Sequence, residues 1–266
     1  MGVFYETIPD NLKTWILDQK MLWVGTAPLA SDGHINISPK GGKAFGIPSP
    51  TSFWYLDLTG SGVETLAHLH EPGNARICIM FLAFEGAPKI IRLWGHGRAV
   101  ENGTPEFDAL VEDYKIQLIP GARSVVVVDV HQVASSCGFS VPYYEWKGWR
   151  STLDEHFAKK DRKFRDGDEK ESMDRYWAWK SQLSIDGLPG MKRGYQYAQH
   201  NDIAPLKKMI GKYAPDPKNP RTVTENASPI HVLMVGLLCF VIGVVLTLTM
   251  VDPEIIRKVQ KKELFI

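Results

Sequence analysis

Cysteine is scarce in this chain of 266 residues, and the three that occur lie far apart. Cys78, Cys137 and Cys239 form no C-x-x-C pair, so the sequence indicates neither a disulfide framework nor a zinc site. The eight histidines include no H-E-x-x-H motif. We therefore expect no metal site, and this pattern is typical of a protein in a reducing compartment.

The chain also lacks a large net charge of either sign. The chain has 31 Lys and Arg against 30 Asp and Glu, which leaves a formal net charge of +1 and no electrostatic basis for binding nucleic acid. The common nucleotide motifs fail as well. No Gly-Lys-Ser/Thr follows Gly60 and Gly62, and Thr65 stands where the third glycine of G-x-G-x-x-G would be.

Long uncharged runs are missing except near the carboxyl end. Residues 230–251 contain no Lys, Arg, Asp or Glu and are long enough to cross a bilayer as a helix. No basic region followed by an apolar one occurs in the first twenty residues, so no signal peptide is indicated. We therefore expect a tail-anchored protein: a globular part in the cytosol (1–195), a linker (196–229), a transmembrane helix (230–251) and a short basic tail (252–266).

The basic residues of that tail favour the opposite orientation under the positive-inside rule. We give more weight to the missing signal peptide. Which membrane would hold the anchor stays open.

Short runs of β-forming residues dominate the first half of the chain. Strands are expected at residues 21–28, 34–38, 52–58, 75–84, 89–100 and 124–133. Only one short helix falls among them, between the third strand and the fourth, which argues against alternating βαβ units. We expect a mainly β fold with flanking helices, built on a six-stranded antiparallel barrel. The apolar strand at 75–84 fits either a closed barrel or a subunit interface.

A glycine-containing turn at residues 59–62 joins an aromatic strand to that helix. Ser61 and Glu64 have the S-x-x-E spacing of a capping box. Backbone amides at the start of the helix could hold a phosphate, assisted by three hydroxyls, those of Thr59, Ser61 and Thr65. A well-capped helix without a ligand is the alternative interpretation.

Charged and aromatic residues fill the segment 145–192. We interpret its charge run as a solvated helical surface rather than a binding patch. Three aromatic residues are expected to pack this region onto the barrel: Tyr176, Trp177 and Trp179.

Eight phrases stand in a characteristic order: 34–41 (HINISPKG), 55–62 (YLDLTGSG), 64–68 (ETLAH), Arg76 with Met80-Phe81, 84–88 (FEGAP), 92–98 (RLWGHGR), 136–138 (SCG) and 184–189 (SIDGLP). Together they resemble the pyridoxamine 5'-phosphate oxidase-like flavin-binding split barrels, over roughly residues 5–195. The resemblance implies a split barrel that forms a homodimer, with FMN in grooves at the subunit interface.

By motif position, the resemblance assigns seven residues to the cofactor. Ser38 and Lys40 would lie on the strand beneath the flavin, and Arg76 would be a further phosphate partner. The phosphate turn and the helix start would contribute Thr59, Gly60, Ser61 and Thr65. A simple turn lysine and a surface arginine are the alternatives for Lys40 and Arg76.

One departure from the family pattern limits the choice of substrate. Pyridoxamine phosphate oxidases have a Ser-Arg-Lys pattern at the phosphate turn, whereas residues 60–63 of this chain contain no Lys or Arg. The carboxy-terminal Arg-x-His motif of those enzymes is not evident here either. Conversion of pyridoxamine phosphate is therefore not expected. The leading hypothesis is an FMN-dependent oxidoreductase of an unknown small organic substrate. The alternative is a non-catalytic flavin- or haem-binding membrane-anchored protein.

Overall fold

The computed structural model describes residues 2–214, 237 and 242. The chain divides into two units, Met1–Val223 and Thr224–Ile266, and the strands and helices given below belong to the first. The predicted membrane span and the basic tail lie outside the described residues, apart from 237 and 242. Within the described part of the chain, no helix combines the length and the apolar character that a bilayer crossing requires.

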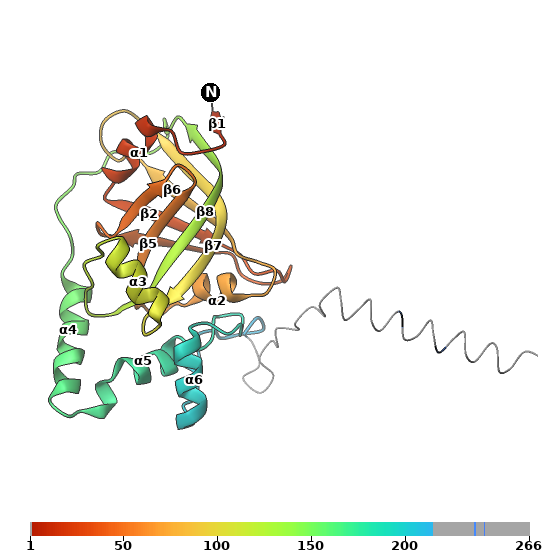
Figure 1. Ribbon diagram of the computed structural model, residues 1–266, viewed down its shortest axis with the longest axis vertical. Helices are drawn as coiled ribbons and strands as arrows, with labels where there is room; N and C mark the ends of the chain where they lie inside the picture. The colour runs from red at the N-terminus through yellow and green to blue at the C-terminus, as the bar shows by residue number, and fades with distance from the viewer. Residues whose placement is uncertain (1, 215–236, 238–241, 243–266) are drawn as a thin grey trace, which may run out of the picture. The chain divides into compact units, whose positions relative to one another are not determined.

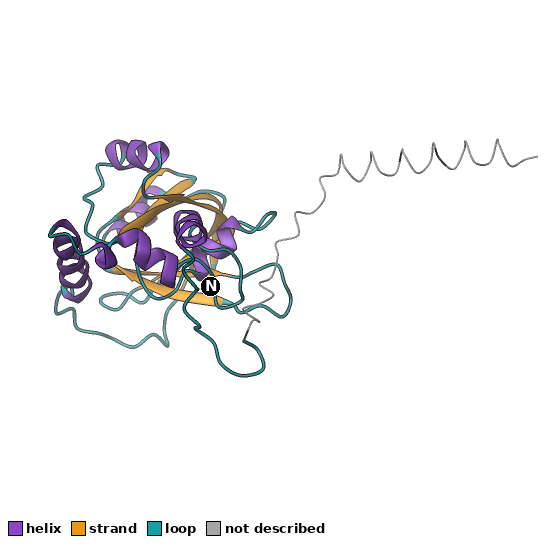
Figure 2. Cartoon of the chain, turned by 90° about the horizontal axis from the view of Figure 1, so that it is seen from below, coloured by secondary structure: helices purple, strands orange, loops and turns teal. Residues whose placement is uncertain are grey.

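A curled antiparallel sheet forms the body of the first unit (Figures 1 and 2). The strand order is β3-β2-β6-β7-β8-β5-β4, and β1 pairs with β8 beside this path. The bounds are β1 Val3–Tyr5, β2 Met21–Thr26, β3 Asn36–Gly41, β4 Phe45–Ser49, β5 Ser52–Leu58, β6 Arg76–Leu82, β7 Ile90–Glu101 and β8 Ala122–Ser136. The mainly β fold is thus confirmed, and the curled sheet agrees with a split barrel.

The expected count of six strands is wrong, because β1 and β4 also belong to the sheet. Strand β4 has the sequence FGIPS, and proline and glycine weaken a strand prediction. Pro48 is tolerated because β4 lies at an edge of the sheet, where a missing amide breaks no ladder. The same reason lets the opposite edge strand, β3, continue through Pro39 to Gly41, beyond the predicted end at residue 38.

Alternation of side chains gives the sheet a buried inner face. In β2, Leu22 and Val24 are buried in the core while Trp23 between them points to the other face. Ile79 and Phe81 of β6 join the same core at 0% exposure. Each such side chain contributes about 1.5–3 kcal/mol through removal from water.

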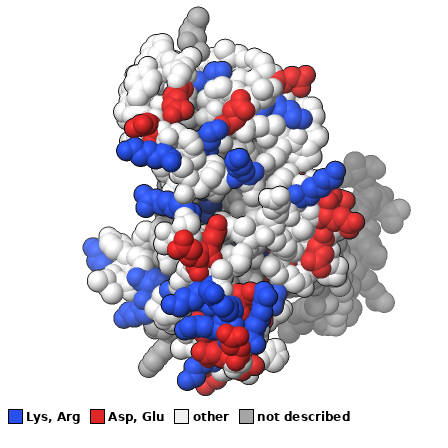
Figure 3. Space-filling model, turned by 90° about the vertical axis from the view of Figure 1, so that its left-hand side faces the viewer, with Lys and Arg blue, Asp and Glu red and all other residues white. Residues whose placement is uncertain are grey.

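Helices cover the ends of the sheet and continue beyond it (Figure 2). Their bounds are α1 Asp10–Leu17, α2 Glu64–His70, α3 Pro105–Asp113, α4 Thr152–Arg165, η1 Glu169–Glu171, α5 Met173–Lys180 and α6 Lys192–Asn201. Figure 3 shows charged side chains of both signs gathered at the lower end of the face on which α4 lies.

The aromatic residues of α5 divide into packed and exposed ones. Trp177 is buried against Val63, Leu66 and Met191, as expected for a residue that fastens the helix to the sheet domain. Trp179 differs from the prediction, because 43% of its surface is exposed.

Two of the family-like phrases meet in space although they are far apart in the sequence. The backbone amide of His34 donates to Asp186 Oδ2 at 2.7 Å, and His34 Nδ1 lies 2.6 Å from Asp186 Oδ1. The phrase at 184–189 therefore fastens the segment before α6 to the loop that precedes β3.

Candidate functional site

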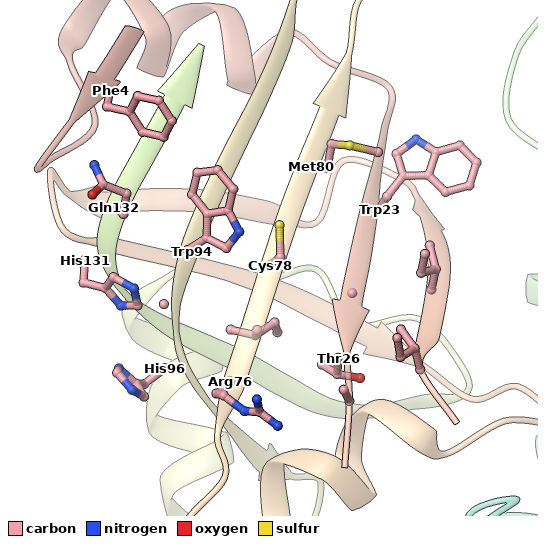
Figure 4. A pocket seen from close by; sticks show the side chains of 16 residues that line it. Phe4, Trp23, Thr26, Arg76, Cys78, Met80, Trp94, His96, His131 and Gln132 are labelled. Carbon is pink, nitrogen blue, oxygen red and sulfur yellow. The ribbon is translucent and has the colours of Figure 1, made fainter. Parts of the chain in front are cut away.

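A cavity of about 760 Å³ lies on the outer face of the sheet, opposite the core (Figure 4). Strands β1, β2, β3, β6, β7 and β8 contribute to it. Its aromatic and sulfur-containing side chains are Phe4, Trp23, Cys78, Met80 and Trp94, and its polar side chains include Arg76, His96, His131 and Gln132. The volume is in the range of pockets that hold small molecules and cofactors.

The strand register produces both the wall and the hollow. Trp23 pairs with Met80, and Cys78 pairs with Trp94, so these outward side chains stand next to one another. Gly25, which pairs with Cys78, provides no side chain on the same face and leaves a hollow there. Gly95 pairs with the core residue Ile77 and so faces the inner side, where a Cβ would approach the carbonyl oxygen of residue 129 to 2.3 Å.

One end of the cavity is polar. The Arg76 guanidinium is oriented by Nε, which donates to Asn74 Oδ1 at 3.2 Å, and by Nη2, which donates to the Pro28 carbonyl at 3.2 Å. His96 is opposite Arg76 in the ladder, and its ring centroid lies 5.3 Å from that of His131. Such a cavity suits a ligand with a flat aromatic part and an anionic arm.

A hydrogen-bond donor in the wall lacks a partner. Trp23 Nε1 is buried, and no described residue accepts from it. An unpaired buried donor costs about 1–3 kcal/mol. An acceptor on a ligand or on a second subunit would remove this cost.

Two of the predicted cofactor residues lie on the other face of the sheet. In β3, Ile37 lines the cavity, so Ser38 points the opposite way, and Lys40 follows Ser38 by two residues. Lys40 Nζ donates to Asp57 Oδ1 at 2.8 Å. The structure therefore does not bring Ser38 and Lys40 into the cavity that Arg76 lines.

Asp57 organises a buried ion cluster that was not anticipated from the sequence. Its carboxylate is fully buried and accepts from Arg123 Nε at 2.5 Å as well as from Lys40. Burial alone would raise the pKa of Asp57, but Arg123 and Lys40 hold it below its ordinary value. Arg123 Nη1 also donates to the Gly62 carbonyl at 2.7 Å, so this cluster fastens the turn at 59–62.

The predicted phosphate turn is largely satisfied by protein contacts. Thr59 is buried and accepts from Trp177 Nε1 at 2.9 Å, and Thr65 is buried and accepts from Asn36 Nδ2 at 3.0 Å. Ser61 is exposed and Gly60 is half-buried. Of the three predicted hydroxyls, that of Ser61 is the one on the surface.

The predicted capping box is wrong. Helix α2 begins at Glu64, with Val63 as N-cap and no side-chain cap. The Glu64 carboxylate instead accepts from the amide of Ile185 at 3.3 Å and lies 3.8 Å from Lys208 Nζ. Contacts with the later part of the chain thus replace the local one.

His68 is a buried residue of α2 and the last residue of the phrase at 64–68. Its Nδ1 lies 2.9 Å from Thr26 Oγ1, and no described residue is bonded to its Nε2. Desolvation lowers the pKa of His68, against the opposing effect of Asp186, Glu71 and Glu64. The folded protein therefore favours the neutral imidazole.

A pH effect follows from this lowered pKa. The unfolded chain takes up the proton at a pKa of about 6.5, so the stability linked to His68 is present above that pH and is lost as the pH falls through the folded pKa. In urea unfolding, wild type should lose more stability between pH 7.5 and 5.5 than His68→Asn does. His156→Asn, an exposed change, should keep the wild-type dependence. Equal pH dependence in wild type and His68→Asn would contradict this assignment.

Metal ligation is not suggested by this geometry. Across residues 2–214, 237 and 242, no three His, Cys, Asp or Glu side chains come close enough together to hold a metal ion.

A fungal protein resembles this chain in sequence. The chain is 41% identical over 144 residues to the pyridoxamine 5'-phosphate oxidase family protein ustO of Aspergillus flavus. The chain is therefore similar in sequence to a protein of the pyridoxamine 5'-phosphate oxidase family. It covers 53% of this chain and 57% of the relative, so the chain spans little more than half the length of that protein. No family model matches the chain.

Solved structures show only weak likeness. HupZ of Group A Streptococcus is 20% identical, with a TM-score of 0.37, and the match covers 48% of this chain and 99% of that one. The FAD-binding protein of Mycobacterium smegmatis is 13% identical, with a TM-score of 0.34, and the match covers 50% of this chain and 93% of that one. A Clostridium acetobutylicum protein of the pyridoxinephosphate oxidase family is 16% identical, with a TM-score of 0.34, and the match covers 47% of this chain and 84% of that one.

Proposed function

We propose that the protein is an FMN-dependent oxidoreductase that acts on a small organic substrate and holds its flavin in the cavity on the outer face of the sheet. The observation that carries this proposal is the amphipathic cavity, with Trp94 and Met80 in its wall and Arg76 at its end. FMN has the matching chemistry, a flat aromatic ring system joined to a phosphate. The similarity to a pyridoxamine 5'-phosphate oxidase family protein adds support for a flavin.

The chain's own residues would bind and orient the cofactor. Arg76 supplies the cation that a phosphate dianion requires, already oriented by Asn74. Trp94 and Met80 would cover the ring system and exclude water from it, and Trp23 Nε1 would donate to a ring acceptor. The bound flavin supplies the electron transfer, so no protein nucleophile is needed.

We further propose that the protein acts as a homodimer through this same face. Phe4, Ile35 and Ile37 line the cavity with 67%, 76% and 68% of their surfaces exposed. A continuous apolar patch of this kind is typical of an interaction site. A second copy seated on it by two-fold symmetry would cover these side chains and close the cavity over the flavin.

Trp94→Glu tests the cavity and the dimer together. A charge in the centre of the patch should convert the dimer to a monomer and release the flavin, since both need an apolar surface there. Light scattering after gel filtration gives the mass, and absorbance gives the flavin content. Leu118→Glu is the control, because Leu118 is 48% exposed but does not line the cavity. A dimeric, flavin-loaded Trp94→Glu protein would contradict the proposal.

A non-catalytic flavin- or haem-binding protein is the second candidate. His96, His131, Cys78 and Met80 line the cavity, and His, Cys and Met are side chains that hold haem iron. The visible spectrum of the purified protein separates the two candidates. Anchoring of either protein to a membrane by residues 230–251 stays a prediction from the sequence.

A further inference from the structure

A second cavity, of about 680 Å³, lies among α4, η1 and α5, with Ile203 at its border. Its wall contains a single carboxylate, that of Glu171. The cationic side chains in the wall are Lys159, Lys160, Lys163, Lys170, Arg175 and Lys180.

Basic and acidic residues are interspersed along the sequence of this segment, but mainly the basic ones line the cavity. Residues 150–180 contain nine Lys and Arg and eight Asp and Glu, so this segment is almost neutral. Six of the nine cations line the cavity, but only one of the eight carboxylates does. The helical spacing of Lys159, Lys160 and Lys163 places them on one face of α4.

Glu171 neutralises only part of this charge. Its carboxylate lies 2.5 Å from Lys160 Nζ and 3.2 Å from Lys163 Nζ, and these two lysines lower its pKa. The other four cations form no ion pair with any described residue. An excess of positive charge therefore remains around the cavity.

Aromatic packing holds the cationic groups toward one another. Phe157 is 1% exposed and packs edge-on against the Tyr176 ring, which joins α4 to α5. The Nζ atoms of Lys160 and Lys180 lie 5.2 and 5.1 Å from the centroid of that Tyr176 ring. Lys180 Nζ is also 4.8 Å from the Trp179 ring. Cations held this way remain close together despite their mutual repulsion.

We propose that this cavity binds a compact phosphate-containing anion with several negative charges. A monoanion would offset one of four unpaired cations, whereas a polyphosphate group meets them together. The concave wall suits a small molecule better than an extended polymer. The proposal uses none of the residues of the flavin cavity and does not rest on the proposed function.

Calorimetric titration of the full-length protein with inorganic triphosphate tests the proposal. Wild type should bind, and added salt should weaken the binding because the cations are near the surface. The double change Lys159→Glu with Arg175→Glu should reduce affinity at least about tenfold, since four units of charge are changed in the wall. Arg162→Glu is the matched control, because Arg162 is exposed on α4 but does not line the cavity.

Two results would overturn the proposal: no binding by wild type, or an equal loss of affinity in Arg162→Glu. If circular dichroism shows that the double variant is unfolded, the single variant Lys170→Glu is titrated instead, because Lys170 is exposed. Its affinity for triphosphate should fall severalfold. Phosphatidylcholine vesicles with and without phosphatidylinositol bisphosphate then identify the source of the phosphate. Triphosphate-sensitive binding to the charged vesicles would assign a lipid headgroup, and triphosphate binding without vesicle binding would assign a soluble ligand.

Discussion

Asp57→Asn will lower the free energy of unfolding by about 3–5 kcal/mol, the usual result of removing one partner from a buried ion pair. The change keeps the shape of the side chain but removes the charge that offsets Arg123, which is only 3% exposed. The turn at 59–62 should loosen as well, because Arg123 Nη1 binds the Gly62 carbonyl. Urea unfolding at neutral pH measures the loss.

An exposed ion pair provides the control for this prediction. Arg98 and Glu106 are paired on the surface with 52% and 58% of their side chains exposed. Glu106→Gln should therefore change stability by less than about 1 kcal/mol. An Asp57→Asn effect no larger than the control would show that the cluster does not stabilise the fold.

The Asp57 carboxylate should also make the stability of the protein depend on pH in acid. Because Arg123 and Lys40 lower the folded-state pKa of Asp57, its contribution is present above the unfolded pKa of about 3.9 and is lost as the pH falls through the folded value. Wild type should lose this stability below pH 4. Asp57→Asn should lack this part of the acid dependence.

Arg76→Ala should weaken FMN binding about 10- to 100-fold, if a charge-assisted hydrogen bond to the phosphate contributes about 1.5–3 kcal/mol. Fluorescence titration of the flavin-free protein with FMN measures the affinity. The fold should be unaffected, because Arg76 is exposed and its contacts are with two loop residues, Asn74 before β6 and Pro28 after β2.

Lys40→Met is the matched comparison, because family position would assign both residues to the cofactor. The structure pairs Lys40 with Asp57 on the inner face, so this change should reduce stability and leave FMN affinity within about twofold, a difference below 0.5 kcal/mol. The reverse outcome, flavin lost in Lys40→Met and kept in Arg76→Ala, would move the phosphate to the turn at 59–62.

Local sequence patterns were sufficient to predict much of the fold. The six expected strands exist because alternating or strongly apolar residues, such as those of β6 and β8, have few other ways to be buried. Strand β4 was missed because Gly46 and Pro48 oppose strand formation, and pairing with β5 outweighs that local preference. Strand β1, with three residues, is too short to show any period.

The candidate site was harder to predict, because strand pairing and long-range contacts decide it. The residue type at Lys40 gives no sign of which face it takes, and only the register of β3 with β2 fixes that. Asp57 and Arg123 are 66 residues apart, and His34 and Asp186 are 152 apart. No local pattern encodes such pairs, so they became visible only in the structure.

The visible absorption spectrum of the purified protein, followed by release and identification of the chromophore, tests the central claim most directly. We predict a flavin spectrum that a reductant bleaches, with FMN as the released compound. A colourless protein that also fails to take up added FMN would contradict the account, and a haem spectrum would favour the second candidate.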